Sequence, residues 1–125
     1  MDAIFISLPN KSSADATIVS LKKNINVFCE KPPATNYKDF IKIYNVYKTK
    51  KNLKIKYGFN HRYHDSIIIA KNSIQKKRYV KLINIRGLYV KSQIINFKWQ
   101  WRSSKFLADV VILLDQGIHL LVILF

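Results

Sequence analysis

The chain has 125 residues, a formal net charge of +15 and 49% hydrophobic residues. These values exclude a disordered chain and allow one small domain with a modest core. Of the 22 basic residues only four are arginines, and the lysines are scattered along the chain. The charge is therefore typical of a solvated surface and does not indicate an arginine-lined phosphate site.

Two features of the sequence bear on the location of the protein. Cys29 is the single cysteine, which favours a reducing compartment, and Met1 is not followed by a secretory signal. The apolar stretch 110–125 carries Asp115 and His119 and is shorter than the about 20 residues of a membrane span. We therefore expect a buried helix there, no membrane partner and a cytoplasmic protein.

The first half of the chain alternates short apolar runs with helical patterns. Residues 4–8, 25–29 and 54–59 predict strands, and the first of them is expected to be buried on both faces. Residues 12–24 and 36–47 between them have the three- and four-residue apolar spacing of helices. Strands and helices in this order, with short links, predict a parallel sheet.

Both predicted helices have candidate capping residues and an apolar stripe. Ser12 and Ser13 are expected to cap the first helix, with Asp15 in its first turn, and Asn36 opens the second. The side chains expected to face the core are Ile18, Val19 and Leu21 in the first helix and Phe40, Ile41, Tyr44 and Tyr47 in the second.

The second half of the chain has a different character. Residues 65–76 predict a helix, 79–89 a strand of another sheet, 90–105 an irregular aromatic loop, and 107–125 a helix that begins or is interrupted near Gly117. The residues expected to face inward from the first of these helices are Ile67, Ile68 and Ile74.

Polar residues follow the predicted strands where ligands bind to a parallel sheet. Pro9-Asn10, Glu30-Lys31 and Asn60-His61-Arg62 come at three successive carboxyl ends, so we expect them to converge on one crevice. An ammonium at Lys31 can stabilise a developing alkoxide, although a surface lysine is the simpler interpretation of that residue alone.

Asp115 and His119 are four residues apart and lie on one face of the predicted helix. An imidazole can accept a hydroxyl proton near neutral pH, while a satisfied helix pair explains the spacing equally well. His61 and His64 lack a third ligand with a recognisable spacing, so no metal site is expected. Trp101, with Trp99, could stack on bases or line a pocket.

Four stretches together resemble a known family. Residues 2–10, 27–32, 58–63 and 114–119 are similar, in the same order, to the glucose–fructose oxidoreductase / inositol dehydrogenase (Gfo/Idh/MocA) family of NAD(P)-dependent oxidoreductases. The resemblance implies an α/β fold, with the C-terminal half of a Rossmann-type parallel sheet followed by the start of an α/β catalytic domain. It places the first part at residues 1–60 and the second at 61–125.

The resemblance also implies a function and a site. The function is hydride transfer between a sugar or cyclitol hydroxyl carbon and the nicotinamide of NAD or NADP. The implied catalytic residues are Lys31, Asp115 and His119. The implied cofactor-binding residues are Leu8, Pro9, Asn10, Glu30, Lys31, Pro32, Trp101 and Arg102, with a cis bond before Pro32. The implied substrate-binding residues are Lys31, Asn60, Arg62, Asp115 and His119.

The sequence departs from the family at three places. It has no glycine-rich phosphate turn, Asp109-Val110-Val111 replaces a run of glycines, and Val122 stands where an aspartate is common. We therefore expect a truncated enzyme with an exposed sheet edge and with impaired or no activity alone. A homo-oligomer or a second chain that carries the missing strands would complete it. The alternatives are a non-catalytic remnant and a basic nucleic-acid-binding module, although no specific nucleic acid is expected.

Overall fold

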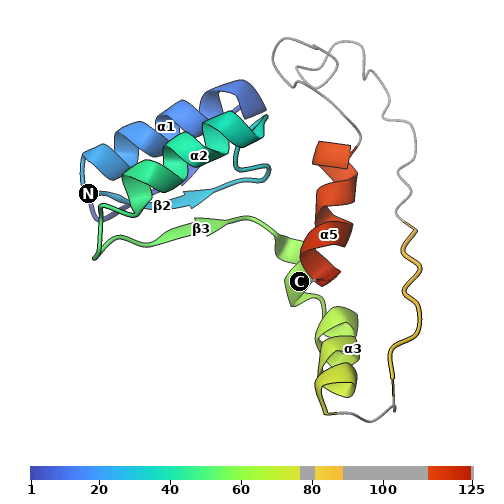
Figure 1. The fold of residues 1–125 in the computed structure, drawn as a ribbon. Coiled ribbons are helices and arrows are strands. Elements are labelled where there is room, and N and C mark those ends of the chain that lie inside the picture. The colour runs from blue at the N-terminus through green and yellow to red at the C-terminus, as the bar shows by residue number, and fades with distance from the viewer. Residues whose placement is uncertain (77–80, 89–112, 125) are drawn as a thin grey trace.

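The computed structural model describes residues 1–76, 81–88 and 113–124 (Figure 1). The strands are β1 (Ala3–Ile6), β2 (Asn26–Cys29) and β3 (Ile55–Tyr57), and the first helices are α1 (Asn10–Lys22) and α2 (Tyr37–Tyr47). The strands form one parallel sheet in the order β1-β2-β3, with Ile4 opposite Val27 and Val27 opposite Ile55. The predicted parallel α/β sheet is therefore confirmed, with strands shorter than expected.

The core lies between the sheet and the two helices, which cover the same face (Figure 1). Its buried apolar residues are Ile6, Ala14, Leu21, Val27, Cys29, Ala34 and Ile43. Burial alternates along each strand, and the opposite face carries Phe5, whose ring stacks on Phe28 at 5.1 Å with 62% of Phe5 exposed. The prediction that the first strand is buried on both faces is wrong, because both crossover helices pack on one side of the sheet (Figure 1).

The two helices begin differently. α1 begins at Asn10, after Pro9, and Ser13 lies inside it with its hydroxyl donating to the Leu8 carbonyl at 3.2 Å. The predicted caps and the first-turn position of Asp15 are therefore wrong, because the helix begins earlier than predicted, with Pro9 at its N-cap. The predicted cap of α2 is confirmed.

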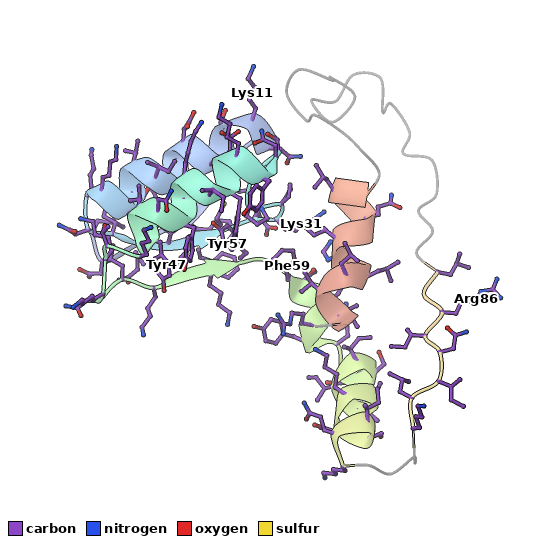
Figure 2. All side chains as sticks on the ribbon, in the orientation of Figure 1. Lys11, Lys31, Tyr47, Tyr57, Phe59 and Arg86 are labelled. Carbon is purple, nitrogen blue, oxygen red and sulfur yellow. The ribbon has the colours of Figure 1, made fainter. Side chains whose placement is uncertain are left out.

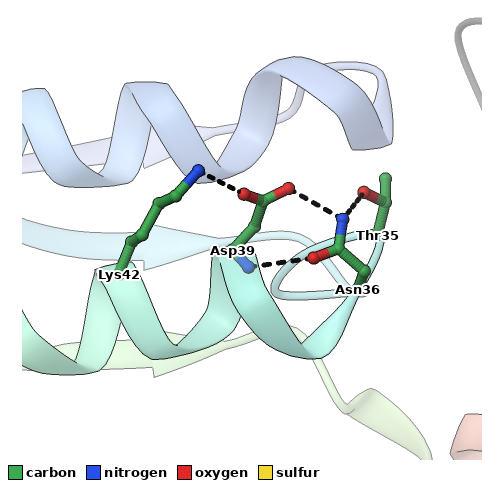
Figure 3. A network of polar contacts seen from close by, with 4 residues as sticks. All are labelled: Thr35, Asn36, Asp39 and Lys42. Carbon is green, nitrogen blue, oxygen red and sulfur yellow. Dashed lines mark hydrogen bonds and ion pairs between the residues drawn. The ribbon is translucent and has the colours of Figure 1, made fainter.

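The α2 cap is a small polar network (Figure 3). The Asn36 side chain accepts from the Asp39 N–H at 3.0 Å and donates to the Asp39 carboxylate at 2.9 Å. Lys42 donates to the other oxygen of Asp39 at 2.7 Å, and these hydrogen bonds lower the pKa of Asp39. The network is exposed and is confined to the N-terminal end of α2, so it serves as the cap of that helix.

The apolar stripes are partly different from those predicted. Val19, Phe40 and Tyr44 are exposed, whereas Ile43 is buried and Val46 packs on the core. Two stripes on α2 have helical spacing, and Ile43 and Val46 pack on the core in place of Phe40 and Tyr44. Leu21, Ile18 and Tyr47 do contact the core as expected.

After β3 the chain leaves the sheet in a 3-10 turn. The elements that follow are η1 (Asn60–Tyr63), α3 (Asp65–Gln75), the π turn η4 (Leu113–Gly117) and α5 (Ile118–Leu124). The helix predicted over 65–76 is present as α3, and the helix that changes near Gly117 is present as η4 and α5. None of these helices is long and apolar enough to cross a membrane, as far as the described residues show.

Two expectations about this half are wrong. α3 buries no residue, and Ile68 and Ile74 are both more than 40% exposed. Residues 81–88 do not form a strand with any described neighbour and expose Ile83 almost fully. Their pattern favours a strand, but a strand needs a partner. The loop predicted over 90–105 lies outside the described residues.

The thiol of Cys29 is fully buried at the end of β2, and burial is the main cause that raises its pKa. We expect no reaction of the folded chain with an aromatic disulfide reagent at neutral pH, because only the thiolate reacts. Absorbance of the released thiolate measures the rate. Full reaction is expected in guanidinium, and equal rates in both states would contradict this placement.

Candidate active site

Lys31 links the sheet to the C-terminal helical segment. It follows β2 by two residues, and the peptide bond between Lys31 and Pro32 is cis. Its ammonium donates to the Asp115 carboxylate at 2.9 Å and to the Asp115 backbone carbonyl at 2.6 Å. The lysine side chain is only 17% exposed, so this ion pair is partly shielded from water. Figure 2 shows Lys31 at the end of the sheet that lies nearest to α5.

His119 lies in α5 next to the same lysine and is buried, with 5% of its surface exposed. Its ring stacks on that of His61 in η1, with centroids 4.0 Å apart and planes 20° apart. Burial, then the positive charges of Lys31 and His61, lower the pKa of His119 to about 4, and Asp115 opposes the shift. The imidazole is therefore neutral at pH 7 and able to accept a proton.

A pocket of about 460 Å³ opens beyond the carboxyl ends of β2 and β3. Its lining residues are Phe28, Glu30, Lys31, Lys56, Tyr57, Gly58, Phe59, Asn60, His61, Tyr63 and His119. Aromatic walls and a few convergent polar groups are typical of a site for a small ligand with a planar ring. The pocket lies where open parallel sheets bind their ligands.

Gly58 keeps one wall of the pocket open. A Cβ at this position would lie 2.8 Å from Oε2 of Glu30. The backbone of both residues is held by the sheet, because the Glu30 N–H donates to Ile6 and the Gly58 N–H to Cys29, both at 2.9 Å. The absence of a side chain at 58 therefore gives the Glu30 carboxylate its place inside the pocket.

The structure brings together five of the residues predicted from the sequence. Glu30, Lys31, Asn60 and His119 line the pocket, and Asp115 contacts Lys31. Other predicted residues are not among the lining residues, and these are Leu8, Pro9, Asn10, Pro32 and Arg62. Their predicted roles in binding stay predictions. Trp101 and Arg102 lie outside the described residues.

Sequence reasoning missed His61 as a partner of His119. Its spacing from His64 raises the question of a metal site, and no group of three metal-ligating side chains is found within the described ranges. Its place in the tripeptide that follows β3 was the available signal, because that tripeptide was expected at the crevice. Lys56 was missed too, although alternation along β3 puts it on the face away from the helices.

The burial of His119 predicts a response of α5 to acid. The pKa of His119 is about 4 in the folded chain and about 6.5 when exposed, so the unfolded form binds more protons between these values. Docking of α5 is fully stable above about pH 6.5 and loses up to about 3 kcal/mol as the pH falls through 4. Hydrogen exchange of residues 118–124, corrected for intrinsic rates, measures this. Protection that is unchanged at low pH would contradict it.

The parallel sheet with helices on one face, and a polar pocket beyond its strand ends, define a nucleotide-binding domain of the Rossmann class. Residues 1–59 match the family model described as the oxidoreductase family with an NAD-binding Rossmann fold. The family model places residues 1–59 in this Gfo/Idh/MocA oxidoreductase family, in agreement with the resemblance.

Solved structures of oxidoreductases and of an NAD-binding protein are similar to this chain. The myo-inositol 2-dehydrogenase of Lactobacillus plantarum is 34% identical over 66% of this chain and 24% of its own, with a TM-score of 0.63. An NAD-binding protein of Listeria innocua is 26% identical over 99% of this chain and 34% of its own, with a TM-score of 0.75. The scyllo-inositol dehydrogenase of Lactobacillus casei, solved with NAD(H) and scyllo-inositol, is 28% identical over 62% of this chain, with a TM-score of 0.60. The chain spans about a quarter of the length of the two inositol dehydrogenases.

Proposed function

We propose that this chain carries the catalytic groups of an NAD(P)-dependent oxidoreductase acting on a sugar or cyclitol hydroxyl. One observation carries the proposal: the ammonium of Lys31, hydrogen-bonded to Asp115, borders the same pocket as the neutral imidazole of His119. Two structurally similar dehydrogenases were solved with NAD(H), one together with scyllo-inositol and one with myo-inositol. A polyhydroxylated ring is therefore the substrate class that the proposal names.

The pocket fits a dinucleotide's nicotinamide end. Phe28 and Phe59 supply apolar walls, and Gly58 leaves room that a Cβ would fill. Glu30 and Lys31 would hold polar groups of the bound molecules. The cofactor, when bound, supplies the acceptor for the hydride.

The protein residues have separate roles in the proposal. A ring nitrogen of His119 takes the proton of the substrate hydroxyl, which neutral imidazole can do at pH 7. The ammonium of Lys31 donates a hydrogen bond to the same oxygen and stabilises the negative charge that develops there. Asp115 holds Lys31 in place through its carboxylate and its carbonyl. In the reverse direction His119 returns the proton.

We also propose a division of the chain that follows this chemistry. Residues 1–60 supply the nicotinamide side of the nucleotide domain, and residues 61–125 open the substrate domain. Asn60, at the start of η1, lies at the boundary and lines the pocket, so it would contact the substrate or the nicotinamide.

We expect weak cofactor binding by the chain alone. Its three glycines, at 58, 87 and 117, do not form the turn whose amides hold a pyrophosphate in Rossmann domains. Isothermal titration of the purified chain with NAD and with NADP should give dissociation constants of about a millimolar or weaker. Micromolar affinity for either would show that the 125 residues contain a pyrophosphate site elsewhere.

A turnover assay tests the proposed function. The purified chain is incubated with saturating NAD⁺ or NADP⁺ and a panel of cyclitols and sugars, and formation of the reduced nicotinamide is followed by absorbance. The proposal predicts reduction with at least one polyol, and a rate at least about a hundredfold lower in the Lys31→Met variant. No reduction above that of the variant, at cofactor concentrations that saturate the pocket, would contradict it.

A further inference from the structure

His61 is a candidate for a role that neither its residue type nor the family model assigns. It lies in η1, two residues before the end of that turn, and its ring lies against His119 at 4.0 Å. The backbone of η1 is fixed by hydrogen bonds from the Arg62 N–H to Phe59 at 3.2 Å and from the His64 N–H to His61 at 3.3 Å. His61 is therefore held in place independently of α5.

We propose that His61 is a positioning residue of this site, whose imidazole plane holds the ring of His119 in the orientation that faces the pocket. The inference rests on the proposed function in one respect, namely that His119 is the base. Helix α5 is only seven residues long and contacts η1, while Lys31 holds the preceding turn η4 through Asp115. A ring on so short a helix needs a rigid surface to keep one rotamer, and the stacked imidazole provides it.

The geometry favours positioning over proton transfer between the two histidines. The N–H groups and lone pairs of an imidazole lie in its plane, and rings only 20° from parallel present their faces to each other. His64 approaches His61 edge-on, with centroids at 5.1 Å, and is itself exposed. The cluster is therefore a stack with an exposed outer member.

The charged groups around the two stacked rings affect the protonation of His61 and His119. The ionisable groups that face it or share its pocket are Glu30, Lys31, Lys56, Tyr57, Tyr63, His64 and Asp115. Burial, then His64 and Lys31, lower the pKa of His61, so both stacked rings are neutral at pH 7. Two imidazolium ions at this separation repel strongly, so the pair accepts its protons one after the other.

The test uses the full chain without cofactor, with three variants and two NMR readouts. His61→Phe keeps a flat ring and removes the charge, His61→Ala removes both, and His64→Phe is the matched control. The first readout is the nuclear Overhauser contact between the His119 ring and the Lys31 side chain. The second is the titration midpoint of His119. Circular dichroism shows whether each variant keeps the sheet and helices.

The proposal predicts that the contact persists in the wild type, His61→Phe and His64→Phe, and is lost in His61→Ala. It predicts an upward shift of the His119 midpoint in both His61 variants and none in His64→Phe. A contact retained in His61→Ala, or a midpoint unaffected by either His61 substitution, would overturn it. These readouts need no turnover, so an inactive chain would contradict the proposed function while leaving the positioning role to be decided by NMR.

Discussion

Replacing Lys31 with methionine is expected to lower turnover of a cyclitol at least about a hundredfold, because the developing alkoxide loses its hydrogen-bond donor. The same change removes the ammonium that contacts Asp115 at two oxygens, 2.9 and 2.6 Å away. The pair is partly buried, so we expect a cost of about 1–3 kcal/mol in the docking of residues 113–124. Hydrogen exchange of that segment and initial rates measure the two effects.

The matched control is Lys42→Met. Lys42 also pairs with an aspartate, Asp39, at 2.7 Å, but this pair is exposed and lies within α2. Surface pairs of this kind contribute little, so turnover and the exchange of residues 113–124 should stay at wild-type values. Equal losses in both variants would show that net charge, and not the contact with Asp115, sustains the site.

Replacing His119 with glutamine is expected to lower turnover by about 10²–10⁴-fold, since an amide can hydrogen-bond but cannot accept the substrate proton. Cofactor affinity, measured by titration, should stay close to that of the wild type, because the imidazole contacts the substrate oxygen in the proposal. The loss should therefore appear in kcat.

His64→Gln is the control for this substitution. His64 is exposed and is not among the residues that line the pocket, so its replacement should leave kcat unchanged. A His119→Gln variant that retains the wild-type kcat would remove the general base from the account. A loss confined to KM would instead assign His119 to substrate binding.

Local sequence signals predicted the part of the fold that positions the site. The apolar runs, the proline after β1 and the Asn36 cap gave the order of strands and helices, and the parallel sheet follows from that order. The local patterns did not predict that Lys31 lies close to Asp115 and His119. Nothing in the spacing links residues 84 positions apart, and the resemblance to a family supplied that link.

The errors share a physical cause, which is that burial depends on what packs against a residue. Phe5 and Phe28 belong to apolar runs that are typical of strands covered on both faces. No described helix covers the face of the sheet on which their rings stack. Ile68 in α3 and Ile83 in residues 81–88 likewise belong to apolar patterns that are typical of buried residues, yet both are exposed. An apolar pattern indicates which side chains can be buried. The surface that packs against the helix or strand decides which of them are buried.

The most direct test of the account is the position of bound cofactor. Titration of the isotopically labelled chain with NAD⁺ and a cyclitol, followed by NMR, should move the signals of Glu30, Lys31, Gly58 and His119 most. Shifts confined to the outer surfaces of α1 and α2 would contradict the account, and so would the absence of any shift at about ten times the expected dissociation constant.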